Sequence, residues 1–159
     1  MIGLFGIIAN EAVLKAGERK KAFSLMMNNI NKEDFNNISV EEKHYSIGLT
    51  RRNIGENKDL SLKLIRDDFL IGFCGYGKFR GEAKYCWAEE MIARIVPVYE
   101  EQGQDALKQI EGSFFCLLVQ ATSFSLISDR VSSKNIFYYK DDKVFIFAPD
   151  VGRVIESRL

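Results

Sequence analysis

The sequence has few of the residues that build metal centres and disulfide frameworks. Its 159 residues include a single histidine, His44, and three cysteines, Cys74, Cys86 and Cys116, with no CxxC pair. Structural zinc sites draw about four ligands from cysteines and histidines at short spacings, and this chain offers no such set. An odd number of widely spaced cysteines also argues against a disulfide framework. We therefore predict no metal site, and reduced, buried thiols in a cytoplasmic protein.

Net charge and long apolar runs are lacking as well. The 22 basic residues balance the 22 acidic ones, so the composition gives no reason to expect a nucleic-acid or membrane-surface partner. No apolar run approaches the roughly 20 residues of a membrane span, and the first residues lack the basic start and cleavage site of a signal peptide. A Walker-type phosphate loop is missing, and the Gly-x-Gly at 75–77 precedes no apolar helix start of a dinucleotide motif.

The apolar patterning predicts an α+β protein with a single domain over residues 1–159. Hydrophobic residues make up 47% of the chain and charged residues 28%, which suits one domain with a substantial core. Short apolar runs predict strands at 2–8, 44–49, 61–65, 69–73, 113–120, 123–128, 136–139 and 144–147. Helical spacing predicts helices at 10–30, 87–101 and 104–110, and a last one that starts within 150–159. We expect loops or turns at 31–42, 51–58 and 75–81, and a kink or break at Pro97.

Several short motifs occur in an order that points to one enzyme family. They are Met1-Ile2-Gly3-Leu4-Phe5-Gly6-Ile7-Ile8, Tyr99 to Gly103, Ile110-Glu111-Gly112-Ser113-Phe114-Phe115, Asp129-Arg130-Val131 with Lys134 and Tyr138-Tyr139, and Phe147-Ala148-Pro149-Asp150. Each motif is weak by itself, but together they span nearly the whole chain. The set resembles the class II glutamine amidotransferase domain of asparagine synthetase-like proteins.

The resemblance implies a fold, a partner and a cofactor. The fold of that family is the N-terminal-nucleophile four-layer sandwich, αββα. Its glutaminase domain feeds ammonia to an ATP-pyrophosphatase synthetase domain that forms an amide, so ATP and Mg are expected only for that partner. The synthetase domain, with its Ser-Gly-Gly-x-Asp-Ser loop, is not on this chain. The resemblance therefore implies that the chain is a fragment, works with a separate synthetase protein, or forms a homodimer.

Carried onto this sequence, the resemblance places the nucleophile at Ile2, where the family has cysteine. An aliphatic side chain cannot attack an amide, so nucleophilic catalysis is excluded there. Because Ile2 is bulky, we expect Met1 to remain and both residues to fill the vestigial pocket. Arg51 is the candidate for the arginine that pairs with the glutamine α-carboxylate, since a planar guanidinium suits a carboxylate. The alternative is that Arg51 and Arg52 are a solvated turn pair.

The two remaining functions of the family's site are altered as well. Its oxyanion-binding Asn-Gly pair becomes Cys74-Gly75, where Gly75 can still offer its backbone N–H but a thiol is a weak donor. The aspartate that holds the substrate amine falls at Met91. Glu89 or Glu90 could replace it only after a register shift, which rotates a helical residue by about 100° per position. With three of four functions altered, the resemblance implies a catalytically inactive glutaminase-like module with a structural, interface or partner-binding role.

Two alternatives stay open. The chain could be an amidohydrolase with a relocated nucleophile at Cys74 or Ser46, for which His44 is the only histidine available as a base. It could also be an amino-acid-sensing domain that keeps Arg51 to bind an amino acid without cleaving it. Otherwise, His44 is interpreted as a partly buried, hydrogen-bonded residue, and Cys74 as a core or strand-end thiol.

Overall fold

The computed structural model describes residues 3–9, 15–28, 35–52, 58–121 and 123–157. Contacts group the chain into two compact units, and each is described by itself below. Unit 1 comprises Met1–Gly55 and Asn135–Leu159, and unit 2 comprises Glu56–Lys134. Each unit holds a five-stranded antiparallel sheet, so the α+β class is confirmed. The prediction of a single domain over 1–159 stays a prediction.

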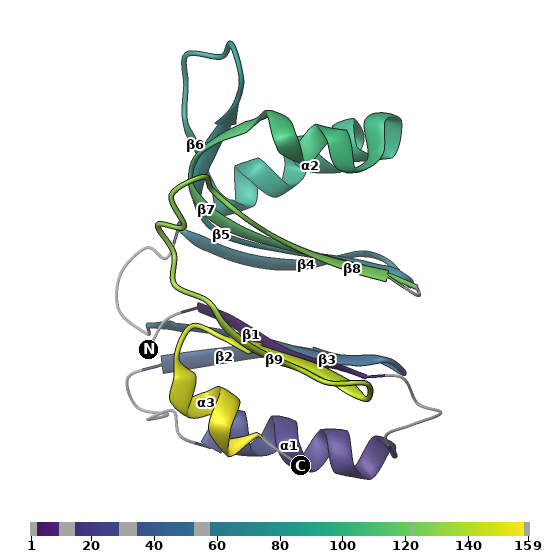
Figure 1. The fold of residues 1–159 in the computed structure, drawn as a ribbon. Helices are drawn as coiled ribbons and strands as arrows, with labels where there is room; N and C mark the ends of the chain where they lie inside the picture. Colours follow the sequence, from purple (N-terminus) through teal and green to yellow (C-terminus); the bar gives the residue numbers. More distant parts are fainter. Residues whose placement is uncertain (1–2, 10–14, 29–34, 53–57, 122, 158–159) are drawn as a thin grey trace. The chain divides into compact units, whose positions relative to one another are not determined.

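Unit 1 is built around its first strand. The sheet has the order β2-β3-β1-β10-β9, and its strands are β1 (Gly3–Ala9), β2 (Phe35–Glu41), β3 (Tyr45–Arg52), β9 (Phe137–Lys140) and β10 (Val144–Ala148). Two helices, α1 (Ala16–Asn28) and α3 (Val151–Glu156), lie on one face of this sheet in Figure 1. Phe5 of β1 stacks on Phe23 of α1 at 5.6 Å between ring centroids, and both side chains are buried. Burial of such apolar side chains holds α1 on the sheet, at roughly 1.5–3 kcal/mol each.

Unit 2 follows the same plan with one long helix. Its strands are β4 (Leu60–Arg66), β5 (Phe69–Phe79), β6 (Cys86–Trp87), β7 (Ile110–Gln120) and β8 (Ser123–Ser128), in the order β4-β5-β7-β8 with β6 paired to β5. Helix α2 (Ala88–Gln102) leads into the 3-10 turn η1 (Gly103–Gln109), and α2 covers one face of the sheet (Figure 1). Alternate residues of β5 and β7 form a buried core with the apolar side of α2: Phe69, Ile71, Phe73, Phe114, Cys116, Leu118, Met91, Ile92 and Ile95.

Seven of the predicted strands occur, with ends that differ by a few residues: 44–49, 61–65, 69–73, 113–120, 123–128, 136–139 and 144–147. The strand predicted at 2–8 is present as β1, although residue 2 lies outside the described residues. The helices at 10–30, 87–101 and 104–110 correspond to α1, α2 and η1, and α3 lies within 150–159. Residues 10–14 and 29–30 lie outside the described residues.

Three predictions about loops and turns were wrong in part. The loop at 31–42 contains strand β2, because residues from Phe35 to Glu41 pair with β3 along their full length, and such pairing overrides an Asn-rich composition. In the predicted turn at 51–58, Arg51 and Arg52 belong to β3, and residues 53–57 lie outside the described residues. The loop at 75–81 begins after Phe79, because β5 continues through its glycines against β7. Helix α2 is continuous from Ala88 to Gln102, so Pro97 does not divide it, and the kink at Pro97 stays a prediction.

Candidate functional site

The predicted site residues fall in both units. Arg51 lies in β3 of unit 1, half-buried and opposite Asn36 of β2. Cys74 and Gly75 lie in β5 of unit 2, and Met91 lies in α2 of the same unit. Ile2 lies outside the described residues. Unit 2 therefore contains three of the predicted positions, and its geometry decides what Cys74 and Gly75 can do chemically.

Cys74 and Met91 belong to opposite faces of the sheet in unit 2. Met91 is fully buried in the core between α2 and the sheet, where it is grouped with Phe73. Successive side chains of a strand point to opposite faces, so Cys74 points away from the face that α2 covers. The helix position to which the resemblance assigns an amine-binding aspartate is thus an apolar core position. The structure does not bring Met91 and Cys74 together.

The thiol of Cys74 is poorly suited to nucleophilic attack. Burial raises its pKa from 9.0 to about 11, because the thiolate loses solvation. The positive charge of Lys134 opposes this rise in the pKa, and the carboxylate of Asp59 adds to it. Nucleophilic cysteines depend on the opposite environment, in which neighbouring cations hold the pKa below its ordinary value. Cys74 is therefore a protonated thiol at neutral pH.

The backbone N–H of Gly75, which the resemblance assigns to the oxyanion, already has a hydrogen-bond acceptor within unit 2. It donates a hydrogen bond to the carbonyl oxygen of Asp59 at 2.6 Å. Gly75 has φ = +114°, and a Cβ atom there would lie 2.0 Å from the carbonyl oxygen of Ser113 in β7. Both observations give glycine a packing role, because only a residue without a side chain permits this close approach of the two strands.

The other candidate nucleophile and base of the sequence analysis lie in unit 1. Ser46 is fully buried in β3, and its hydroxyl has no hydrogen-bond partner within the described part of the chain. His44 is half-buried, just before β3, and its carbonyl oxygen accepts a hydrogen bond from Ala9 N at 2.9 Å. Ser46 is thus inaccessible to a substrate from solvent, and its position in the middle of the sheet explains its burial.

A compact polar loop follows β8 in unit 2, and sequence reasoning missed its role. Asp129 is buried, and its carboxylate accepts hydrogen bonds from the backbone N–H groups of Phe114 (3.1 Å), Val131 (3.0 Å) and Ser133 (3.2 Å). The hydroxyl of Ser133 also donates to it, and lies 2.6 Å from the hydroxyl of Ser113. Burial opposes ionisation of Asp129, but these hydrogen bonds outweigh it and hold its pKa below the ordinary value.

The Asp129 loop had a signal in the sequence. Asp129 was noted there only as part of a family motif, whereas an aspartate followed within four residues by serines is typical of a turn closed by its own side chain. Its hydrogen bond to Phe114 N joins the loop to β7, which is the strand that contacts Gly75. The loop therefore fixes the end of the sheet near Cys74.

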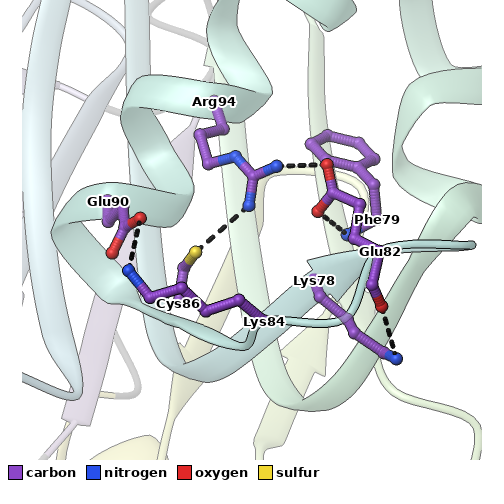
Figure 2. A network of polar contacts seen from close by, with 7 residues as sticks. All are labelled: Lys78, Phe79, Glu82, Lys84, Cys86, Glu90 and Arg94. Carbon is purple, nitrogen blue, oxygen red and sulfur yellow. Dashed lines mark hydrogen bonds and ion pairs between the residues drawn. The ribbon is translucent and has the colours of Figure 1, made fainter.

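A second polar network holds the hairpin between β5 and β6 to α2 (Figure 2). Arg94 of α2 donates to Glu82 and, at 3.1 Å, to the sulfur of Cys86. The other carboxylate oxygen of Glu82 accepts from Phe79 N at 3.1 Å, and its carbonyl oxygen accepts from Lys78 at 2.8 Å. The hydrogen bond to Cys86, followed by that to Glu82, raises the pKa of Arg94, so the guanidinium stays charged. These contacts join the hairpin to α2.

The described residues also bear on the expected absence of a metal site and a membrane span. They contain no group of three or more histidine, cysteine, aspartate or glutamate side chains able to hold a metal ion. In the same residues, no helix has the length and apolar character needed to cross a membrane.

Comparison with known proteins gives no family for this chain. No protein-family model matches it, and no curated protein matches it at the significance required.

Proposed function

We propose that the chain is a catalytically inactive glutaminase-like module, with the four-layer αββα fold, that serves an ATP-dependent, asparagine synthetase-like amide-forming enzyme. Its role is structural or partner-binding, and any ATP and Mg belong to the partner synthetase. The observation that carries the proposal is the state of the Cys74-Gly75 pair. The thiol has a pKa of about 11, and the Gly75 N–H donates to Asp59.

These two observations remove the chemical basis of a relocated glutaminase. Acyl transfer needs a nucleophile that can lose its proton and at least one donor aimed at the oxyanion. At pH 7 a thiol with a pKa of about 11 is ionised in roughly one molecule in 10⁴. The backbone N–H of Gly75, which the resemblance assigns to the oxyanion, instead donates to the carbonyl oxygen of Asp59. The alternative that uses Cys74 as nucleophile is therefore disfavoured.

A partner-binding role is supported by an exposed aromatic cluster on the β5–β6 hairpin. Tyr76, Tyr85 and Trp87 are exposed by 38%, 49% and 48%. The ring of Tyr76 contacts those of Tyr85 and Trp87 edge-on, at centroid distances of 5.6 and 5.5 Å. Tyrosine and tryptophan are the residues most enriched at the energetic centres of protein interfaces. The network of Figure 2 joins this hairpin to α2, and a hairpin held in place in this way would lose less entropy on binding.

The first test is glutamine hydrolysis by the purified chain, with released ammonia and glutamate followed over hours. The proposal expects no turnover above buffer, and the same result for Cys74→Ala. Turnover that Cys74→Ala abolishes would overturn the proposal and make this an enzyme with a relocated nucleophile. Turnover that survives Cys74→Ala would overturn it too, and would direct the search to Ser46.

A second measurement separates the structural role from amino-acid sensing. Isothermal titration with glutamine, glutamate and aspartate tests whether Arg51 still holds a substrate-like carboxylate. The proposal expects no heat of binding for any of the three. Binding that Arg51→Gln removes would replace the structural role by a sensing role.

A further inference from the structure

A cavity of about 580 Å³ lies beside β8, the edge strand of unit 2. It falls within the usual size range of small-molecule sites. Its walls come from η1, the start of β7, strand β8 and the loop that follows: Gln104, Leu107, Lys108, Ile110, Phe114, Ser125, Leu126, Ile127, Ser128, Asp129 and Arg130. All of them belong to unit 2.

The lining of the cavity has an apolar part and a polar part, and most groups of the polar part are hydrogen-bond donors. Leu107, Ile110 and Phe114 belong to the buried core and supply an apolar floor. Arg130 and Lys108 are exposed cations at the edge of the cavity. An apolar floor with a few convergent polar groups is the usual composition of a ligand pocket.

The carboxylate of Asp129 makes no ion pair with these cations within the described part of the chain, although its negative charge remains in the cavity wall. Both of its oxygens accept hydrogen bonds from the loop and from Phe114, so it is saturated by internal donors. Arg130 makes no ion pair within the described part of the chain. Lys108 lies 2.6 Å from Asp105, but both side chains are more than 70% exposed, and such surface pairs are weak and readily exchanged.

A hydroxyl adds to the donors. Ser125 Oγ lines the cavity and accepts from Gln104 Nε2 at 3.1 Å, and within the described part of the chain its hydroxyl hydrogen has no acceptor. A guanidinium, an ammonium and a hydroxyl around an apolar floor complement a molecule with an apolar body and one anionic end. A guanidinium binds a carboxylate with two parallel hydrogen bonds, so a carboxylate is the anion that suits it best.

We propose that this cavity binds a small organic carboxylate, with its aromatic or aliphatic body against Leu107, Ile110 and Phe114 and its carboxylate on Arg130. The site is independent of the proposed function, because neither Cys74 nor Arg51 contributes to it. It would give the module a ligand-dependent stability or conformation whether or not a synthetase partner is present.

The test uses 3-phenylpropionate, with 3-phenylpropan-1-ol as a ligand of the same body without charge. Saturation-transfer NMR and titration of backbone amide signals are followed on the whole chain. We expect the carboxylate to bind with a Kd of about 1 mM or tighter, and to shift the amide signals of η1 and β8. The alcohol is expected to bind at least about fivefold more weakly, because it makes no charge-assisted hydrogen bond.

Matched variants locate the site. Arg130→Gln is expected to weaken binding of 3-phenylpropionate by at least about fivefold. Arg66→Gln, which changes another exposed arginine of unit 2 outside the cavity, is expected to leave it unchanged. Equal binding of acid and alcohol would overturn the proposal and reduce the cavity to an apolar groove. No binding of the acid at several millimolar, or the same loss in both variants, would also overturn it.

Discussion

Replacing Asp129 should destabilise the chain more than replacing any exposed aspartate. The buried carboxylate accepts hydrogen bonds from three backbone N–H groups and from the hydroxyl of Ser133. In Asp129→Ala all of these donors lose their acceptor at once. The hydrogen bond from Phe114 N is buried, so water cannot replace the carboxylate there, whereas the other donors are partly exposed and can find water.

The magnitude follows from this division. A buried donor left without a partner costs about 1–3 kcal/mol, and each partly exposed hydrogen bond contributes about 0.5–1 kcal/mol after exchange with water. We therefore expect Asp129→Ala to lower the free energy of unfolding by about 2.5–6 kcal/mol. Ser133→Ala removes one donor and leaves the carboxylate in place, so its expected cost is about 1 kcal/mol.

The pH dependence has a definite sign. The pKa of Asp129 in the folded state lies below its ordinary value of 3.8, so its ionised form stabilises the fold. This contribution is fully present above the ordinary pKa and is lost as the pH falls through that value toward the lower folded pKa. The wild-type chain should therefore lose more stability than Asp129→Asn between about pH 5 and pH 2.

Urea unfolding at pH 7 and across the acid range measures both effects. Amide hydrogen exchange of Phe114 tests the mechanism, because its protection should fall in Asp129→Ala even under native conditions. The control is Asp142→Asn, which changes an exposed aspartate before β10 and should alter stability by less than about 0.5 kcal/mol. Equal stability of the Asp129 and Asp142 variants, with unchanged exchange of Phe114, would refute the reasoning.

Three further predictions concern the neighbouring structure. The first is alkylation of Cys74 by iodoacetamide at pH 8, followed by mass spectrometry. Because the pKa of Cys74 is about 11, alkylation should be about a hundredfold slower than for a thiol with a pKa of 9.0. A rate equal to that of a free thiol would contradict the raised pKa. In urea unfolding, Gly75→Ala should destabilise the chain by more than about 2 kcal/mol. The control Gly17→Ala, on an open face of α1, should stabilise it by about 0.5–1 kcal/mol. Similar effects of the two substitutions would contradict the packing argument. Arg94→Gln removes the ion pair with Glu82. It should lower the thermal midpoint by an amount equivalent to about 1 kcal/mol and speed proteolysis of the β5–β6 hairpin. An unchanged cleavage rate would show that the pair does not hold the hairpin.

The elements were largely predictable because apolar periodicity is local. The strand β10 and the helix α2 were recognised from runs and helical spacing that depend only on neighbouring residues. Strand β2 was missed because its sequence contains two asparagines and an exposed Ile38, and its extended form depends on pairing with β3. Such pairing is a property of distant segments, so composition alone gives no sign of it.

The chemistry of the site was less predictable than its residues. Sequence position identified Cys74 and Gly75 as the pair to examine, but the pKa of the thiol depends on its burial in the sheet and on two charges, Lys134 and Asp59. The Gly75 N–H donates to the carbonyl oxygen of Asp59, and no sequence motif connects these two residues. The cavity beside β8 was missed for the same reason, because η1 and β8 are brought together only by the fold.

Gly75 also shows why a matching residue is weak evidence for a retained activity. A glycine at this position agrees with the family's oxyanion-binding pair, and that agreement alone would favour a surviving donor. In the structure the glycine is required for a different reason, because any Cβ would collide with the backbone of β7. In the same conformation, the Gly75 N–H donates to the carbonyl oxygen of Asp59. Packing is therefore sufficient to account for this glycine. Evidence for catalysis has to come from the nucleophile, and the raised pKa of Cys74 argues against catalysis.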